Sequence, residues 1–145
     1  MRRFITSLLI IACMSSSALA DIHEFKYFSL NIPDDWAVSE KILENGTSII
    51  AIVPEEGNNT PGALAMTSGN TGGLTVKEIA EKYAKDLGGS QPETDGEGNY
   101  FFSFNDGNSH AMTIGDENFY IFTAVSAINE SNDILLDILN SLELK

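Results

Sequence analysis

The sequence predicts an α+β domain in which a twisted, mainly antiparallel sheet of about six to seven strands carries two main helices, arranged as an α/β/α sandwich. Three observations predict this fold class. Aromatic and β-branched runs alternate with short Gly, Asp and Asn clusters, which is typical of strands joined by tight turns. A capping box precedes one amphipathic stretch, and a second amphipathic stretch lies near the C-terminus. Helices of this kind bury their apolar faces against a sheet.

Three consecutive strands form the centre of the predicted sheet. They are expected at residues 100–104, 109–114 and 119–125, with turns at Asp106-Gly107 and at residues 115–118. Apolar side chains of the last run fall on both faces, with Phe119 and Ile121 on one face and Tyr120 and Phe122 on the other. A strand that is apolar on both faces is typical of a position inside a sheet with a layer over each face.

Four earlier strands complete the predicted sheet. They are expected at residues 24–32, 36–43, 47–53 and 62–67. Pro33 stops the first strand because proline cannot donate to a strand ladder. Asn45-Gly46 predicts a two-residue hairpin turn with positive φ at both positions. Trp36, which opens the second of these strands, is expected to lie in the core at the edge of the sheet.

Two helices are predicted from their capping signals and apolar stripes. Thr75 and Glu78 form a capping box, and Gly88-Gly89 ends the helix that follows. Its expected apolar face consists of Ile79, Ala80, Tyr83, Ala84 and Leu87. Asn129 or Ser131 is expected to cap the last helix, whose apolar stripe consists of Ile134, Leu135, Ile138, Leu139 and Leu142.

The first 20 residues have the pattern of a secretory signal peptide. A short cationic start is followed by an apolar stretch and by the small-residue site Ala18-Leu19-Ala20. Cleavage after Ala20 would leave residues 21–145 as one globular domain in a secreted or periplasmic protein, with no transmembrane segment. The alternative is lipid attachment at Cys13, within Ile10-Ile11-Ala12-Cys13, which would anchor the domain to a membrane.

The charge of the expected mature chain limits its partners. Residues 21–145 contain six lysines, no arginine and 21 carboxylates, which gives a net charge of −15. Nucleic-acid binding requires clustered Lys or Arg, so we expect no nucleic-acid partner. A basic protein partner or a small ligand is compatible with this charge, and the oligomeric state is left open.

No catalytic, cofactor-binding or metal-binding residues are predicted. His23 and His110 have no second His or Cys at ligand spacing, and no Gly-x-Ser-x-Gly motif accompanies them. Three pairs of neighbouring carboxylates have the composition of solvated turns: Asp34-Asp35, Glu55-Glu56 and Asp116-Glu117. The Gly-rich segments 69–73 and 96–98 lack the lysine and the strand-to-helix context of a phosphate-binding loop.

Calcium is the metal that the acidic loops could favour. Asp95, Glu97, Asn99 and Asp106 fall at positions 1, 3, 5 and 12 of a loop of EF-hand length. Tyr100 stands where the motif needs glycine, so the match fails.

One segment carries a resemblance to a known family. The residues Phe28-Ser29-Leu30-Asn31-Ile32-Pro33-Asp34-Asp35-Trp36, together with the order of the predicted elements, resemble the PsbP-like family of α/β/α sandwiches. This family includes the PsbP subunit of photosystem II, the Mog-type Ran-binding factor and secreted bacterial DcrB-like proteins. The resemblance implies a binding or accessory protein rather than an enzyme, and it assigns no site residue.

The function expected from these observations is that of a secreted, non-enzymatic accessory or binding protein of the bacterial cell envelope. It would act through its acidic surface on a protein partner or a small ligand. The alternative is an unrecognised periplasmic hydrolase or a calcium-binding domain with a site built from acidic loops.

Overall fold

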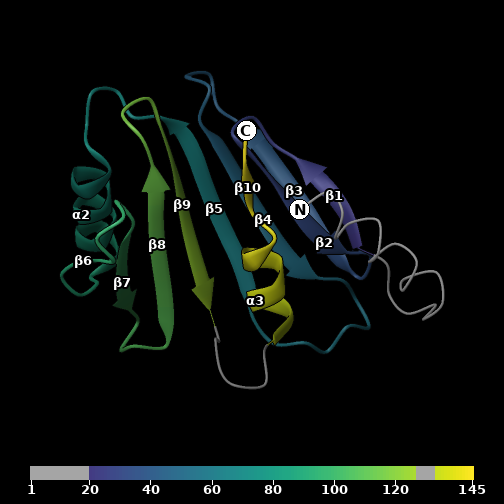
Figure 1. Ribbon diagram of the computed structural model, residues 1–145. Helices are drawn as coiled ribbons and strands as arrows, with labels where there is room; N and C mark the ends of the chain where they lie inside the picture. Colours follow the sequence, from purple (N-terminus) through teal and green to yellow (C-terminus); the bar gives the residue numbers. More distant parts are fainter. Residues whose placement is uncertain (1–19, 127–132) are drawn as a thin grey trace.

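The computed structural model describes residues 20–126 and 133–145. Residues 1–19 of the expected signal peptide, with Cys13, and the expected caps Asn129 and Ser131 lie outside this described part, whereas Ala20 is described. The described chain has an α+β fold with two helices and two antiparallel sheets (Figure 1). The α+β class predicted from the sequence is therefore confirmed.

The larger sheet has seven strands. Its spatial order is β3 (Trp36–Ile42), β4 (Ser48–Pro54), β5 (Ala63–Asn70), β9 (Phe119–Ser126), β8 (Ser109–Gly115), β7 (Tyr100–Phe104) and β6 (Glu93–Thr94). All neighbouring strands are antiparallel. The central position of β9 agrees with its apolar side chains on both faces.

The smaller sheet corrects the prediction of a single sheet. It contains β1 (Ala20–Glu24), β2 (Phe28–Pro33) and β10 (Glu143–Leu144), in that spatial order. The single strand predicted at 24–32 was wrong, because a tight turn interrupts it: the Phe25 N–H donates to the Phe28 carbonyl at 2.8 Å. Both rings are buried and stack with centroids 4.9 Å apart, so the turn lets two aromatic side chains enter one core.

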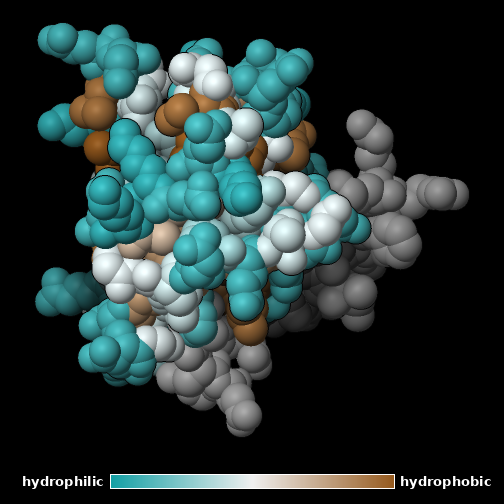
Figure 2. All heavy atoms as spheres, turned by 90° about the vertical axis from the view of Figure 1, so that its left-hand side faces the viewer, coloured by the Kyte–Doolittle hydropathy of each residue, from teal (hydrophilic) through white to brown (hydrophobic). Residues whose placement is uncertain are grey.

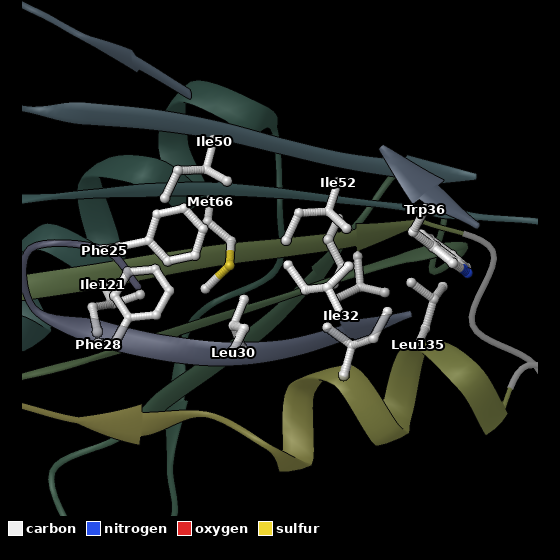
Figure 3. Close-up of a cluster of buried hydrophobic side chains, with 13 residues drawn as sticks. Phe25, Phe28, Leu30, Ile32, Trp36, Ile50, Ile52, Met66, Ile121 and Leu135 are labelled. Carbon is white, nitrogen blue, oxygen red and sulfur yellow. The ribbon is translucent and has the colours of Figure 1, made fainter. Parts of the chain in front are cut away.

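The main core fills the space between β2, α3 (Asp133–Asn140) and one face of the larger sheet (Figure 3). Phe28, Leu30 and Ile32 alternate along β2 with more exposed residues, so this strand supplies three side chains to the main core. Leu135 points from α3 toward Ile32 and Trp36 (Figure 3). The predicted core position of Trp36 is confirmed.

The opposite face of the larger sheet carries α2 (Val76–Leu87). Thr75 and Glu78 form the predicted capping box, and Gly88 ends the helix in the left-handed conformation with φ 66°. Ala84 and Tyr83 pack on a second apolar cluster that includes Phe102 and Phe122. Leu87 was expected on this apolar face, but its side chain is 41% exposed.

Two further details differ from the predictions. The β3–β4 turn has positive φ at Gly46 but not at Asn45, and the Gly46 N–H donates to the Leu43 carbonyl at 2.9 Å. It is therefore a longer turn that ends in a left-handed glycine rather than a two-residue turn. The last helix ends at Asn140 instead of reaching Leu142, because Ser141 bonds to β2 through Asn31 N–H at 2.8 Å and β10 follows.

Candidate functional site

A hollow of the described surface lies beside α2, where the helix passes the end of the larger sheet. It encloses about 370 Å³. Polar and apolar side chains from four segments line it: Asn45 and Thr47; Asn70, Thr71 and Leu74; Ile79, Lys82, Tyr83 and Asp86; and Tyr120. We call this hollow the α2 groove. Viewed from the α2 side, the molecule is mostly hydrophilic, with hydrophobic residues in small groups (Figure 2).

Backbone features at the ends of β4 and β5 shape one wall of the α2 groove. A Cβ at Gly69 would lie 3.1 Å from Thr47 Oγ1, so glycine lets the β3–β4 turn approach β5 closely. The Asn70 side chain accepts from the Gly72 N–H at 2.7 Å, and Thr71 Oγ1 donates to the Glu117 carbonyl at 2.8 Å. The first bond stabilises the turn after β5, and the second joins this turn to the β8–β9 turn.

A pair of tyrosines forms the floor of the α2 groove. The hydroxyl oxygens of Tyr83 and Tyr120 lie 3.4 Å apart, and the Tyr83 ring stacks on Phe122 with centroids 3.9 Å apart. Burial, with the hydrogen bond to Tyr120, raises the pKa of Tyr83 above its usual value. The phenol therefore stays neutral across the physiological pH range and serves as a hydrogen-bonding group rather than as a base.

One cation and one anion border the α2 groove. Lys82 and Asp86 are four residues apart on α2, so their Cβ atoms are neighbours at roughly 5–6 Å on one helix face. Within the described ranges, the ion pair is Lys145–Glu24 at 3.6 Å, which does not involve this helix. Neither Lys82 nor Asp86 takes part in an ion pair within the described ranges.

The histidines that the sequence singled out lie outside the α2 groove. His23 is half-buried on β1, and His110 is exposed on β8, facing away from α2. No histidine lines the groove. Among residues 20–126 and 133–145, no three or more His, Cys, Asp or Glu side chains form a group that could hold a metal ion.

The acidic segment of residues 95–99, which begins the loop of EF-hand length, is a turn between β6 and β7. The Asp95 carboxylate accepts from the Asn99 side-chain amide and from the Glu97 N–H, each at 2.8 Å. These hydrogen bonds, that of Asn99 first, lower the pKa of Asp95. Asp106 lies in a different turn with φ 55°, so the four candidate ligands do not belong to one loop.

A cluster of carboxylates lies at the start of β3. Partial desolvation, a hydrogen bond with Asp21, and repulsion from Asp21, Asp35 and Glu55 raise the pKa of Asp34. The Glu55 N–H donates to the Asp35 carbonyl at 2.9 Å, which holds the two turns together. The Asp116-Glu117 pair also lies in a turn, where Asp116 accepts from the Asn118 N–H at 2.7 Å.

The α2 groove was not predicted as a site from the sequence. Tyr83 and Ile79 were assigned to the apolar face of the helix, and Lys82 and Asp86 were not singled out. A tyrosine inside an otherwise aliphatic helix stripe was the one available signal, because its hydroxyl requires a polar environment.

Comparisons with known proteins place few constraints on this chain. No family model and no curated protein matches it. One solved structure that resembles it is a protein from Bacteroides thetaiotaomicron, with 17% sequence identity and a TM-score of 0.46. The match covers 88% of this chain and 48% of that protein, so the chain spans about half its length. Neither described helix is long and apolar enough to cross a membrane.

Proposed function

We propose that this chain is a non-enzymatic binding protein of the bacterial cell envelope, and that it holds a small zwitterionic molecule, such as an amino acid or a short peptide, in the α2 groove. The observation that carries the proposal is the composition of the groove. It combines the neutral Tyr83, whose hydroxyl lies 3.4 Å from that of Tyr120, with one lysine and one carboxylate, and it contains no histidine.

The chemistry of the groove supports binding rather than catalysis. Lys82 can bind a ligand carboxylate, and Asp86 can bind an ammonium group at the distance of about one helical turn. The two tyrosines and the amides of Asn45 and Asn70 add donors and acceptors between these charges. A volume of about 370 Å³ is at the small end of ligand sites, which favours a small molecule.

Membership of the PsbP-like family of α/β/α sandwiches is part of this proposal. Two features support it: α2 packs on one face of the larger sheet, and α3 with β2 packs on the other. The segment from Phe28 to Trp36, which carried the resemblance, forms β2 and the entry to β3. The family would make an accessory or binding role the expected one.

Export to the envelope is also proposed, and the mass of the protein isolated from cells tests it. Cleavage after Ala20 gives a chain that begins at Asp21. Lipid attachment at Cys13 would instead give a heavier, detergent-soluble chain that begins at Cys13.

Binding is tested by adding amino acids and dipeptides to the domain of residues 21–145 while its thermal unfolding is followed. A ligand at 100 times its dissociation constant stabilises the folded state by about 2.7 kcal/mol. Lys82→Met and Asp86→Asn should each abolish the shift given by the best ligand. Lys85→Met is the matched control, because Lys85 lies on the same helix but lines a separate hollow of about 180 Å³.

Two results would contradict this assignment. No stabilisation by any zwitterion would exclude that ligand class, and a shift that Lys85→Met removes as fully as Lys82→Met would exclude the groove. The expected acidic-surface interaction with a basic protein is tested separately by affinity capture at low and high salt, since such a complex weakens as salt screens the charges.

A further inference from the structure

The face of the larger sheet that carries α2 is only partly covered. α2 packs on β7 and β8, its cluster extends to β9, and Tyr83 reaches Thr67 of β5, whereas β3, β4 and the rest of β5 have no layer over this face within the described part of the chain. The uncovered side chains are every second residue from Ala37 to Lys41 in β3 and from Ile49 to Val53 in β4, with Ala63 and Ala65 in β5. We call this surface the bare face.

The bare face is apolar, and its side chains are mostly small. Ile49 is 45% exposed and Val53 is 40% exposed, and they flank Ala51 along β4. Ala51 pairs with Ala65 of β5, which is also exposed. Large side chains are therefore separated by alanines, a pattern that lets a second flat surface approach closely.

The bare face contains no carboxylate, although the chain from residue 21 has a net charge of −15. Its one charged residue is Lys41, at the end where β3 leaves the sheet. A basic partner would be attracted to the acidic surfaces instead, and an acidic protein would be repelled from them. The bare face can therefore receive a second copy of this acidic chain without placing carboxylates of the two copies opposite each other.

The charges at the two ends of the bare face complement each other in a two-fold arrangement. Lys41 marks one end, and the turns that contain Asp35 and Glu55 adjoin the other end. A two-fold axis that crosses the strands near Ala51 brings the Lys41 end of each copy to the Asp35–Glu55 end of the other. This is an isologous interface, in which the same patch serves both copies.

We propose that the bare face is the interface of a homodimer, in which the larger sheets of two copies pack face to face with their strand ends reversed. Two sheets that pack in this way lie about 10 Å apart and interdigitate their side chains. Ile49 and Val53 of each copy then contact the alanines of the other. The proposal does not depend on the α2 groove or on its ligand.

Sedimentation velocity over a concentration series of the domain of residues 21–145, at about 0.05 M and about 0.5 M NaCl, tests the proposal. The expected result is a monomer–dimer equilibrium that shifts toward the dimer at high salt, because the screening of repulsion between two acidic copies outweighs the screening of the rim pairs. Ile49→Glu should weaken the dimer roughly tenfold or more, since it buries an unpaired charge in each copy.

The matched control is Ile42→Glu. Ile42 lies on the same strand ribbon, is 67% exposed and points to the opposite face, because it pairs with the inward-facing Ser48. This variant should dimerise like the original protein. Circular dichroism establishes that each variant folds, and Ala65→Glu on the neighbouring strand replaces Ile49→Glu if that variant does not.

Three results would overturn the proposal. The first is a monomer at both salt concentrations. The second is a dimer that Ile42→Glu disrupts as strongly as Ile49→Glu, or that Ile49→Glu and Ala65→Glu both leave intact. The third is a dimer that dissociates at high salt. Ligand binding by monomeric Ile49→Glu would leave the function proposed for the α2 groove unaffected.

Discussion

Replacing Leu135 by alanine should destabilise the protein far more than replacing its neighbour Leu136. Leu135 is 0% exposed in the main core, and Leu136 is 39% exposed on the same helix, so one substitution is compared at two degrees of burial. The change in helix propensity is identical at both positions and cancels. The difference therefore measures how firmly α3 docks on β2 and the larger sheet.

The magnitude follows from the atoms removed. Leucine to alanine deletes three carbon groups, each worth about 0.8 kcal/mol when fully buried, and the cavity that remains adds to the loss. We expect about 3–4 kcal/mol for Leu135→Ala. For Leu136→Ala we expect about 1 kcal/mol, because part of that side chain is already in water and no closed cavity forms.

The protein supplies its own probe for this experiment. Trp36 is the single tryptophan of the chain, is buried, and lies next to Leu135 (Figure 3). Urea unfolding followed by its fluorescence should show a large fall in the midpoint for Leu135→Ala at an unchanged slope. In thermal unfolding, the same loss corresponds to a shift of about 10–15 °C. Equal losses for the two variants would refute the docking of α3 through Leu135.

Three other predictions concern α2 and the acidic turns. Thr75→Ala should cost about 1 kcal/mol at pH 7. The hydrogen bonds of Thr75 to Glu78 hold the pKa of that carboxyl below its ordinary value of 4.5. This part of the stability is therefore present above pH 4.5 and is lost as the pH falls through the lowered value. Urea midpoints should show that Thr75→Ala destabilises the protein less at about pH 3 than at about pH 7. Gly89→Ala should cost about 1–3 kcal/mol, because its Cβ would lie 2.6 Å from the Phe102 ring; the cost should shrink in a Phe102→Leu background, and an unchanged cost would rule out this clash. Asp34→Asn should raise the melting temperature at about pH 7. The pKa of Asp34 is raised in the folded state, so its carboxylate form opposes folding at pH values above 3.8. The gain in melting temperature should disappear in acid, where the Asp34 carboxyl is protonated, and a gain that persists there would contradict the repulsion.

Local signals in the sequence were sufficient for much of the fold. The capping box of Thr75 and Glu78 involves atoms three residues apart, so its prediction needs no tertiary contact. The two-sided apolar pattern of β9 was sufficient to place it inside the sheet. Both predictions succeeded because each depends on a single element.

The second sheet could not be predicted in the same way. The segment that contains Phe25 and Phe28 has the composition of a continuous strand. Only the burial of both rings in one core favours the turn that separates β1 from β2. β10 has two residues, and its pairing with β2 joins positions more than 110 residues apart. Neither feature has a local signature that a single sequence could reveal.

The α2 groove was missed for the same reason. Its lining comes from segments as distant as Asn45 and Tyr120, and each segment alone has the composition of an ordinary turn, helix face or strand. The sequence predicts Tyr83 on the apolar face of the helix, and in the structure only its ring packs in an apolar cluster. The hydroxyl lies 3.4 Å from that of Tyr120 on β9, a contact that depends on tertiary packing.

The α2 groove and the bare face have a common structural origin. An α-helix is about 10 Å wide and strands are about 4.8 Å apart, so one helix covers roughly two strands of a sheet. α2 is the one described helix on its face of a seven-stranded sheet, and it packs on β7 and β8. Toward β4 and β3 the sheet therefore lies beyond the reach of this helix. Where the flank of α2 toward β5 meets the β3–β4 turn, polar side chains enclose a hollow suited to a small ligand. Where it faces β4 and β5, the apolar surface is open and suited to a second copy.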